Sequence, residues 1–549
     1  MANPLDDPLY YLHNFRQVLH WLGQRYADLL DTDEQHFIQQ FDRLPQPSQA
    51  LLVRMVMRKG VHFRAGKLNY VEIGCPHAAA APLLALGWVD GHCLLAIEEL
   101  FALLQKGELL SAFKPWIEQP KGKKADWLEG LTARFNEPRS FAQWCPDLAD
   151  TLYSLTVMEL CDRLRLMFFG NLHQDWSEFV LADLGIYTYE KVEFCAESRG
   201  LRSRDDVHGY LFLHQCQHAF ESGEAVDEVL ARIASLRTDN PWLEKRRAKL
   251  LFQVGQSCER SAELALAQQI YRACTYPGAR ARLIRVLERQ EDYVQALALA
   301  SAAQQAPESA AEQQHLLRVV PRLRRKLGEP ALPKPKPRPV TRLDLDLALP
   351  EPLMSVEYCV QAHLSAPDAP VHYVENGLIN SLFGLLCWEV IFAPLPGAFF
   401  HPFQRGPVDL HSEDFHQRRA PLFAACFEQL QDERYKTTIR QRYRDKWGIQ
   451  SPFVFWNLLS EELLEQALAC LPAAHLRYWF ERLLLDIRAN RSGMPDLIQF
   501  WPAQKTYRMI EVKGPGDRLQ DNQLRWLEFC GEYQMPVTVC YVRWAEQPA

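Results

Sequence analysis

The sequence predicts a multidomain protein whose first two-thirds are mainly α-helical and whose final part is an α/β domain. At 549 residues, the chain is too long for a single hydrophobic core. Apolar residues recur with helical spacing from about residue 8 to residue 325, and a proline-rich stretch then ends the pattern. Runs of strand-type residues follow that stretch, so we expect the β-sheet in the C-terminal part.

The composition is that of a soluble globular protein. Hydrophobic residues make up 48% and charged residues 23%, and no apolar run reaches the eighteen or so residues that cross a bilayer. The first residues lack the charged-then-apolar pattern of a signal peptide, so we expect a protein that stays inside the cell and away from membranes. The net charge of −7 argues against indiscriminate binding of polyanions. Any contact with DNA therefore has to come from local basic patches.

The cysteines signal neither a zinc module nor a disulfide framework. All fourteen are scattered singly, without a C-x-x-C pair. His214, Cys216 and His218 are spaced two apart, but no second group of matching spacing accompanies them. We therefore assign no metal site there.

Residues 1–90 are predicted to form an N-terminal helical region. Apolar residues between Asn14 and Leu22 follow the spacing of an amphipathic helix, and a second helix begins at Thr32. A third helix, starting near Leu51, carries basic residues on or near one face, and the basic character continues into the next loop. These residues are Arg54, Arg58, Lys59 and Lys67. They fit either a DNA contact or a solvated helix face.

Residues 91–140 are predicted to contain two short helices around a lysine-rich turn. Lys121, Lys123 and Lys124 lie near a helix N-terminus, where ammonium groups and backbone N–H groups both attract phosphate. A unit of this size and pattern resembles a SAP domain, a module that grips the duplex backbone. A solvated loop is the alternative interpretation.

Residues 141–328 are predicted to be helical throughout, with an internal repeat. The motif at residues 265–267, Ala-Leu-Ala, recurs at residues 296–298, each time after an apolar helix and a polar turn. Small residues at close helix crossings resemble tetratricopeptide-type hairpins, which usually present a surface to a partner. Arg280 and Arg282 stand between the two motifs.

The clearest domain boundary is the segment of residues 329–354. Proline at alternate positions forces an extended linker, and the residues from Val340 to Leu347 then alternate as a strand. The last domain is predicted to cover residues 355–549.

A β-hairpin in this last domain brings two carboxylates together. Strand-type residues run on both sides of a break at residues 502–504. If the turn centres on Ala503 and Gln504, paired residue numbers sum to 1007, and Asp496 faces Glu511. Facing side chains lie roughly 4.5–5.5 Å apart at Cβ, and Lys513 shares the same sheet face as Glu511.

Two facing carboxylates repel each other unless a cation lies between them. Carboxylate oxygens suit Mg²⁺ or Mn²⁺, which also bind phosphates, and Lys513 can hold a scissile phosphate or orient an attacking water. This is the arrangement of metal-assisted phosphodiester hydrolysis. An ordinary hairpin with a salt-bridged, solvated face is the alternative.

These residues match the PD-(D/E)XK nucleases, and residues 511–519 match the Glu-Val-Lys-Gly-Pro-x-Asp-Arg-Leu signature of the VRR-NUC domain. From about Tyr10 to the C-terminus the chain resembles the Fanconi-associated nuclease family. The resemblance implies a VRR-NUC nuclease domain with a central mixed β-sheet after the helical region. Eukaryotic members carry an N-terminal ubiquitin-binding zinc finger, which this sequence lacks, so we expect a bacterial member.

The resemblance also implies the composition of the active site. Glu375 would complete a metal shell formed by Asp496, Glu511 and the carbonyl of Val512, which would hold one or two Mg²⁺ or Mn²⁺ ions. Lys513 would position the nucleophile, and Gln523 would steady it.

Further residues are implied to contact DNA. The family grips a 5′-terminal phosphate with arginines, which correspond to Arg488 and to Arg280 or Arg282, and Arg491 flanks the same approach. Asn522 stands where the family has a lysine, so this part of the pocket departs from the pattern. The basic residues of the N-terminal region occupy a position at which the family contacts DNA.

The implied activity is cleavage of nicked or branched duplex DNA near a 5′ flap, with 5′-to-3′ stepping, in interstrand cross-link repair. A monomer in the bacterial cytoplasm is expected; a eukaryotic member would be nuclear. The alternatives are another PD-(D/E)XK junction or restriction-type nuclease, or a catalytically silent scaffold that binds protein through its helical repeats.

Overall fold

The computed structural model describes residues 7–117, 119–174, 176, 187–330 and 340–545. The chain forms two compact units. The first comprises Met1–Tyr187 and Phe194–Val207, and the second comprises Thr188–Glu193 and His208–Ala549. Within the described residues, no helix combines the length and the apolar composition that a membrane crossing requires.

The first unit begins with a helical region built around a small sheet. The predicted helix at Asn14–Leu22 and the predicted start at Thr32 are confirmed. The elements are α1 (Tyr10–Arg25), α2 (Thr32–Arg43), α3 (Gln46–Val56), α4 (Pro76–Ala85) and α9 (Met158–Phe169), and the antiparallel strands β1 (His62–Arg64), β5 (Leu152–Leu155) and β2 (Val89–Asp90). A short helix at Ala196–Ser198 completes it, and α11 (Arg204–Glu221) contains the boundary between the units.

Within its described residues, the SAP-like segment has four helices, three of them in the stretch where the sequence predicted two around the lysine-rich turn. The predicted first helix is divided near Gln105, because the Glu108 carboxylate accepts the Gln105 N–H at 2.7 Å and starts a new helix. Its elements are α5 (Ile97–Leu103), α6 (Lys106–Ala112), α7 (Lys124–Thr132) and α8 (Phe141–Trp144), with the paired strands β3 (Leu94–Leu95) and β4 (Arg139–Ser140). These elements enclose their own hydrophobic core.

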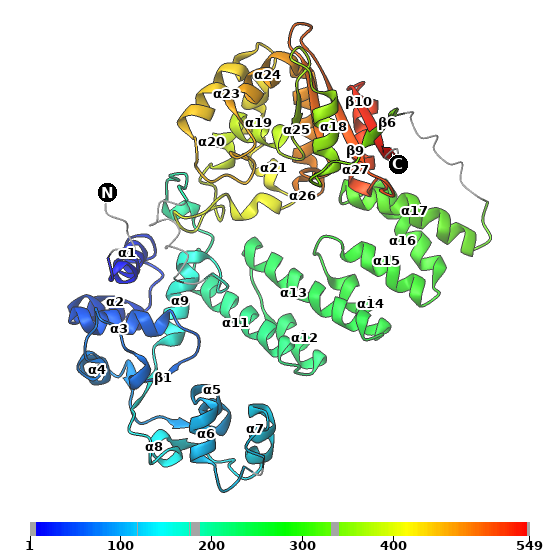
Figure 1. Ribbon diagram of the computed structural model, residues 1–549. Helices are drawn as coiled ribbons and strands as arrows, with labels where there is room; N and C mark the ends of the chain where they lie inside the picture. Colours follow the sequence, from blue (N-terminus) through cyan, green and yellow to red (C-terminus); the bar gives the residue numbers. More distant parts are fainter. Residues whose placement is uncertain (1–6, 118, 175, 177–186, 331–339, 546–549) are drawn as a thin grey trace. The chain divides into compact units, whose positions relative to one another are not determined.

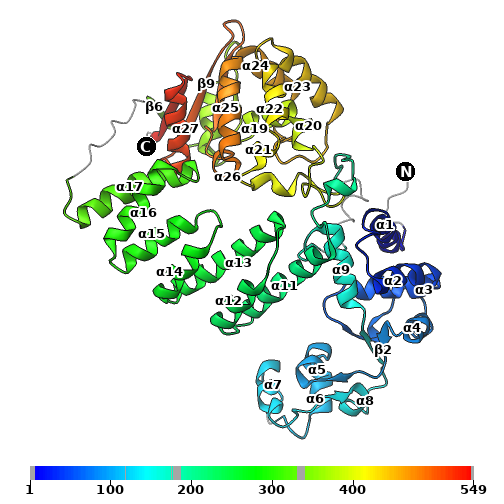
Figure 2. The same cartoon turned by 180° about the vertical axis from the view of Figure 1, so that it is seen from behind.

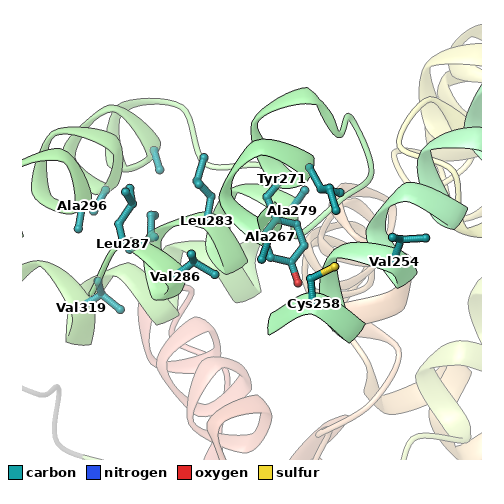
Figure 3. Close-up of a cluster of buried hydrophobic side chains, with 14 of the residues drawn as sticks. Val254, Cys258, Ala267, Tyr271, Ala279, Leu283, Val286, Leu287, Ala296 and Val319 are labelled. Atoms are coloured by element: carbon teal, nitrogen blue, oxygen red, sulfur yellow. The ribbon is translucent and has the colours of Figure 1, made fainter. Parts of the chain in front are cut away.

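The second unit contains a stack of helices in which sequence neighbours lie side by side (Figures 1 and 2). The stack comprises α12 (Val226–Ser235), α13 (Pro241–Arg260), α14 (Leu264–Ala273), α15 (Ala279–Arg289), α16 (Tyr293–Gln305) and α17 (Ala310–Lys326). Ala267 and Ala296, one from each predicted motif, are fully buried in its core (Figure 3). The small residues therefore allow the close helix contacts that the repeat predicted.

The remainder of the second unit is organised around a five-stranded sheet in the order β6-β10-β9-β8-β7. The strands are β6 (Thr341–Ala348), β7 (Val371–Tyr373), β8 (Leu497–Trp501), β9 (Thr506–Lys513) and β10 (Val537–Ala545). β10 pairs in parallel with β6 and β9, while β8 is antiparallel to β9 and β7, so the sheet is mixed, as expected. The strand predicted within residues 329–354 is thus an edge of this sheet and not a separate linker strand.

Helices of this α/β part follow the strands or connect them. They are α18 (Val356–Leu364), α19 (Leu378–Leu386), α20 (Trp388–Ile391), α21 (Phe415–Arg418), α22 (Ala420–Glu428), α23 (Arg434–Asp445), α24 (Glu461–Cys470), α25 (Ala473–Leu485), α26 (Ile487–Asn490) and α27 (Asp521–Glu532). A one-turn 3₁₀ helix lies at Val408–His411 in this part, and another lies at Ala65–Lys67 in the first unit. In Figure 1 the helix α27 lies beside the strands β9 and β10, and the sequence returns from it directly into β10.

The helical stack generates a stability prediction at Gly255, in α13. A methyl group there would lie 2.8 Å from Cε1 of the buried Tyr271, whose hydroxyl donates to Glu259 at 3.1 Å. The ring is buried and its hydroxyl is hydrogen-bonded, so it cannot easily move away from the added methyl group. Gly255→Ala should therefore lower the free energy of unfolding by roughly 1–3 kcal/mol. Chemical denaturation measures this.

The control is Gly531→Ala in α27, where nothing lies within 4 Å of the added methyl group. That variant should be neutral or more stable by up to about 1 kcal/mol, because alanine is the better helix former. Equal effects of the two substitutions would contradict the close crossing of α13 and α14.

Candidate active site

The hairpin β8–β9 forms in the predicted register. Leu497 pairs with Ile510 and Trp501 pairs with Thr506, so that the paired numbers sum to 1007 as expected. The turn therefore places Asp496 and Glu511 at facing positions, just beyond the last pair. The Val512 N–H donates to Asp496 Oδ2 at 2.8 Å and fixes this carboxylate at the end of β8.

The backbone of Asp496 also holds the segment that follows β7. Its carbonyl accepts the N–H of Val374 at 2.8 Å and the N–H of Glu375 at 3.1 Å. Three strand ends thus converge on one residue, and the three predicted carboxylates, Glu375, Asp496 and Glu511, belong to the same end of the sheet.

Glu511 and Lys513 form a buried ion pair. Glu511 is fully buried, and the Lys513 ammonium lies 2.8 Å from its Oε1. Within the described part of the chain, neither Glu511 oxygen accepts a hydrogen bond of good geometry. Burial, together with the charge of Asp496, raises the pKa of Glu511 to about 8, although Lys513 opposes the shift.

The environment of Asp496 also disfavours the ionised carboxylate. Burial raises its pKa to about 6, while the Val512 N–H and Lys513 lower it and the charges of Glu357 and Glu375 add to the increase. Two buried carboxylates with raised pKa values, of which Glu511 has unsatisfied oxygens, are the environment that a hard divalent cation stabilises.

Glu375 lies at the rim of the site. Its side chain is exposed, and the Tyr373 hydroxyl and the Asn376 amide both donate hydrogen bonds to its carboxylate. Asn376 has a left-handed backbone with φ of 52°, and its Oδ1 accepts the Met494 N–H at 3.0 Å. This turn joins the Glu375 segment to the loop that leads into Asp496.

The donor set fits a divalent cation, although the side chains do not converge as a completed metal shell. In the described ranges, no group of three or more His, Cys, Asp and Glu residues lies at metal-binding spacing. Lys513 instead compensates Glu511. A bound ion would be held by Asp496, Glu511, Glu375 and the carbonyl of Val512, and Lys513 would then be released from its pair.

Gln523 lies in the first turn of α27, as predicted, where its side chain caps the helix. Its Oε1 accepts the Gln520 N–H at 2.9 Å. Among the described residues, no hydrogen bond joins it to the carboxylates or to Lys513, so its predicted catalytic role is not visible in this arrangement.

Arg280 and Arg282, predicted to form a phosphate pocket with Arg488, each pair with an acid in the structure. Arg280 lies 2.6 Å from Glu312, and Arg282 lies 3.4 Å from Glu259, both inside the helical stack. The charge of Arg488 acts instead on Lys245, from α13, and on His411. Lys245 and His411 are thus close enough for the charge of Arg488 to act on them.

This second cluster contains several basic side chains. Burial lowers the pKa of Lys245; the charges of Asp414 and Glu413 oppose this shift and that of Arg488 adds to it, and the Lys245 ammonium donates to Ser412 at 2.7 Å. Burial and the nearby charges of Arg488, Arg491 and Lys245 lower the pKa of His411. A cavity of about 250 Å³ is lined by both His411 and Arg491. We refer to Lys245, His411, Arg488 and Arg491 as the basic cluster.

The predicted DNA-contact residues of the first unit divide into two groups. Arg54 pairs with Glu72 at 2.7 Å and stacks over Tyr11 and Tyr70, and the Lys124 ammonium donates to the Leu104 carbonyl at 2.9 Å. These two side chains support the fold. The remaining side chains are exposed: Arg58, Lys59, Lys67, Lys121 and Lys123.

Sequence reasoning missed Glu357, Lys245 and His411. The signal for Glu357 was its position in a helix start after Ser355, whose hydroxyl accepts the Tyr358 N–H. Its effect on Asp496 nevertheless depends on α18 lying against the sheet, which no local pattern reveals. Lys245 and His411 are separated from Arg488 by long stretches of sequence.

Comparison with known proteins agrees with this architecture. The chain matches the family descriptions "FAN1, HTH domain" over residues 9–90, "Fanconi anemia-associated nuclease SAP domain" over residues 94–144 and "VRR-NUC domain" over residues 430–544. The mixed sheet and its Asp496, Glu511 and Lys513 cluster therefore belong to a VRR-NUC nuclease.

Similarity over the whole chain identifies the family. The "Fanconi-associated nuclease 1 homolog" of Pseudomonas aeruginosa is 61% identical, over 98% of this chain and 97% of that protein. The homologue from Arabidopsis thaliana is 24% identical over 97% of this chain and 67% of that protein. The chain belongs to the Fanconi-associated nuclease family, as a bacterial member, and is a DNA nuclease.

Solved structures show the same fold. The crystal structure of paFAN1 bound to 2nt 5′ flap DNA with gap superimposes with a TM-score of 0.91 at 61% identity, covering 99% of both chains. A second complex, with 1nt 5′ flap DNA with gap, gives a TM-score of 0.89 over 98% of this chain and 100% of that one.

The raised pKa of Glu511 predicts how stability depends on pH. Between the ordinary pKa of 4.5 and about 8, the folded protein keeps a proton on Glu511 that the unfolded chain has lost. Unfolding thus releases a proton, and without divalent ions the free energy of unfolding should fall as pH rises through this range. Below pH 4.5, Glu511 is protonated in both the folded and the unfolded protein, so it adds no pH dependence. Thermal unfolding in EDTA against pH measures this trend.

The matched variant is Glu511→Gln, which keeps the shape of the side chain but cannot ionise. Its unfolding temperature should fall less between pH 5 and pH 8 than that of the wild type. Mn²⁺ competes with the proton, so the stabilisation by Mn²⁺ should be larger at pH 8 than at pH 6 and should be lost in the variant. Parallel pH curves for the two proteins would show that Glu511 is not responsible.

Proposed function

We propose that this nuclease hydrolyses phosphodiester bonds with Mg²⁺ or Mn²⁺, as a 5′ flap endonuclease with 5′-to-3′ exonuclease stepping. The observation that carries the proposal is the buried pair of Asp496 and Glu511 facing each other beside Lys513. One or two bound ions would supply an activated water and neutralise charge on the phosphate.

The side chains of the chain have distinct parts in this reaction. Asp496 and Glu511 would hold the cation, and the hydrogen bond from the Val512 N–H fixes the position of the Asp496 carboxylate. Once Glu511 has another cationic partner, the Lys513 ammonium can turn to the attacking water or to a non-bridging phosphate oxygen. There it would stabilise the charge that develops in the transition state.

Similarity supports the choice of substrate. Two solved structures at 61% identity are described as paFAN1 bound to 5′ flap DNA. We infer that branched or nicked duplex DNA is the substrate of this chain, and that the cleavage serves interstrand cross-link repair. We further propose that the protein acts as a monomer.

The basic cluster is proposed to bind a terminal 5′ phosphate. A guanidinium and an ammonium near one another attract a dianion more strongly than a monoanion. Asn522 lies against Gly493, where an added methyl group would meet it at 2.8 Å, so the position of the family lysine adjoins the Arg491 loop but is uncharged here. In this chain Lys245 is proposed to supply the missing charge.

Exposed cations of the first unit are proposed to hold the duplex. Lys121 and Lys123 project near the start of α7, and Arg58, Lys59 and Lys67 surround the strand β1. These contacts to phosphates would position the DNA without reading its sequence.

A catalytically silent scaffold is disfavoured by energetics. Burying two facing carboxylates costs stability unless a cation offsets it, and Lys513 compensates only one of them closely. A protein that only bound partners through its helices would gain nothing from keeping this arrangement.

Asp496→Ala should abolish cleavage of a labelled 5′ flap while leaving flap binding in EDTA within about twofold. Asp496 is buried and holds the cation site without being placed to touch DNA. Single-turnover cleavage with Mn²⁺ and a binding titration in EDTA measure the two effects. Asp432→Ala, which removes an exposed acid paired with Arg434, serves as the control and should remain active. Cleavage by Asp496→Ala above a few per cent of wild type would refute the site assignment.

The phosphate proposal predicts that a substrate ending in 5′ phosphate is cut faster, and at a more uniform position, than the same DNA ending in 5′ hydroxyl. A terminal phosphate carries about 1.5–2 charges at pH 7, whereas an internal phosphodiester carries one. Arg488→Ala and Lys245→Ala should each remove most of this difference, a loss on the order of 1–3 kcal/mol, while slower and less uniform cleavage persists.

The control is Arg477→Ala, an exposed arginine paired with Glu481 four residues along α25. It should keep the wild-type preference. Equal wild-type rates on the two ends would show that the basic cluster does not bind the terminal phosphate.

A further inference from the structure

Two tyrosines in contact with each other, Tyr373 and Tyr358, adjoin the Glu375 carboxylate of the active site. The Tyr373 hydroxyl donates to the carboxylate of Glu375. The ring of Tyr373 in turn contacts the ring of Tyr358, with centroids 5.5 Å apart and planes inclined by 31°. Tyr358 is 48% exposed, so an aromatic face stands at the rim of the site without full cover from protein.

The backbone fixes the position of Tyr358. It lies in the first turn of α18, where the Ser355 hydroxyl caps the helix by accepting its N–H. Val356, two residues earlier, lies against Gly514, just after β9, where an added methyl group would meet it at 3.2 Å. Glu357, between them, is close enough for its charge to act on Asp496. The start of α18 is therefore anchored to the strand that carries Glu511 and Lys513.

Two exposed apolar side chains shortly precede Tyr358 in the sequence. Leu353 is 82% exposed and Met354 is 52% exposed, just before the N-cap of α18. Neither the phosphates nor the metal chemistry needs exposed apolar side chains. A nucleic acid base does, because every base has an apolar face that stacks on aromatic rings. A paired base within a duplex is already stacked, so only a base that has left its helix can use such a ring.

We propose that Tyr358, backed by Tyr373, is a stacking platform for the unpaired base of a nucleotide next to the cleaved phosphodiester. The proposal rests on the proposed nuclease function and adds a residue that selects where the enzyme cuts. A base leaves its helix most easily at a nick, a flap or a frayed end. The platform would then make cleavage sensitive to DNA structure independently of the terminal phosphate.

The proposal also assigns separate tasks to the two rings. Tyr373 supports the platform and holds Glu375 through its hydroxyl, so its loss would disturb the metal site as well. Tyr358 is a positioning residue whose ring alone is needed. Tyr358→Phe should therefore behave as wild type, whereas Tyr358→Ala should not.

The experiment compares single-turnover cleavage of a 5′ flap by wild type, Tyr358→Ala and Tyr358→Phe in Mn²⁺. The cut is first mapped with wild type, and two further substrates then carry an abasic site on either side of the cleaved bond. Tyr358→Ala should cut the normal flap about tenfold or more slowly, in line with the usual contribution of base stacking on an aromatic side chain. On the abasic flap that lacks the stacked base, wild type should slow to the rate at which Tyr358→Ala cuts the normal flap. Wild type and Tyr358→Ala should then cut this abasic flap at equal rates.

The matched control is Tyr478→Ala. Tyr478 is also an exposed tyrosine stacked on another tyrosine, Tyr533, at 4.1 Å, but it lies on α25. It should cut both normal and abasic flaps at the wild-type rates. Slowing by this variant equal to that of Tyr358→Ala would point to a general effect on folding and would overturn the platform.

The outcomes separate the two proposals. Wild type that cuts no flap would overturn the nuclease function and the platform with it. Wild type that cuts well, but with no loss in Tyr358→Ala or no effect of either abasic site, would overturn the platform alone. The platform would also be overturned if Tyr358→Ala slowed cleavage of the abasic flap by the same factor as cleavage of the normal flap. A base and the ring it stacks on form one interaction, so loss of the ring should have no further effect once the base is absent.

Discussion

The structure depends on the burial of two carboxylates, Asp496 and Glu511, at facing positions of one hairpin. Such a pair is unfavourable by itself, because burial and mutual repulsion both oppose ionisation. Its retention at the end of the sheet, with Lys513 against one of the two, defines where a cation is needed. We propose that the chemistry of the nuclease follows from this shortage of positive charge.

Much of the surrounding fold serves to hold these groups still. The amide of Val512 orients Asp496, the Asp496 carbonyl ties down the Glu375 segment, and Asn376 joins that segment to the loop before β8. The same unit contains a second group of cations, in which the charge of Arg488 acts on Lys245 and His411. We propose that the carboxylates perform hydrolysis and that this second group binds the DNA end.

The sequence predicts best what local patterns determine. The hairpin register followed from the turn at Ala503 and Gln504, because antiparallel pairing fixes every partner once the turn is placed. The predicted start of α2 and the repeat alanines Ala267 and Ala296 are local signals too. Contacts between distant segments were not predictable in this way. Lys245 beside Arg488, and Glu357 near Asp496, depend on how whole helices lie against each other. The ion pair of Arg280, a predicted phosphate ligand, with Glu312, thirty-two residues later, is another such contact.

The most direct test of the central claim is a crystal structure of the protein grown with Mn²⁺, in which anomalous scattering locates the ions. The account predicts an ion bound by Asp496 and Glu511 together with the Val512 carbonyl, and a Lys513 ammonium that has moved away from Glu511. A saturating concentration of Mn²⁺ that leaves the Glu511–Lys513 pair intact, with no ion between the two carboxylates, would contradict it.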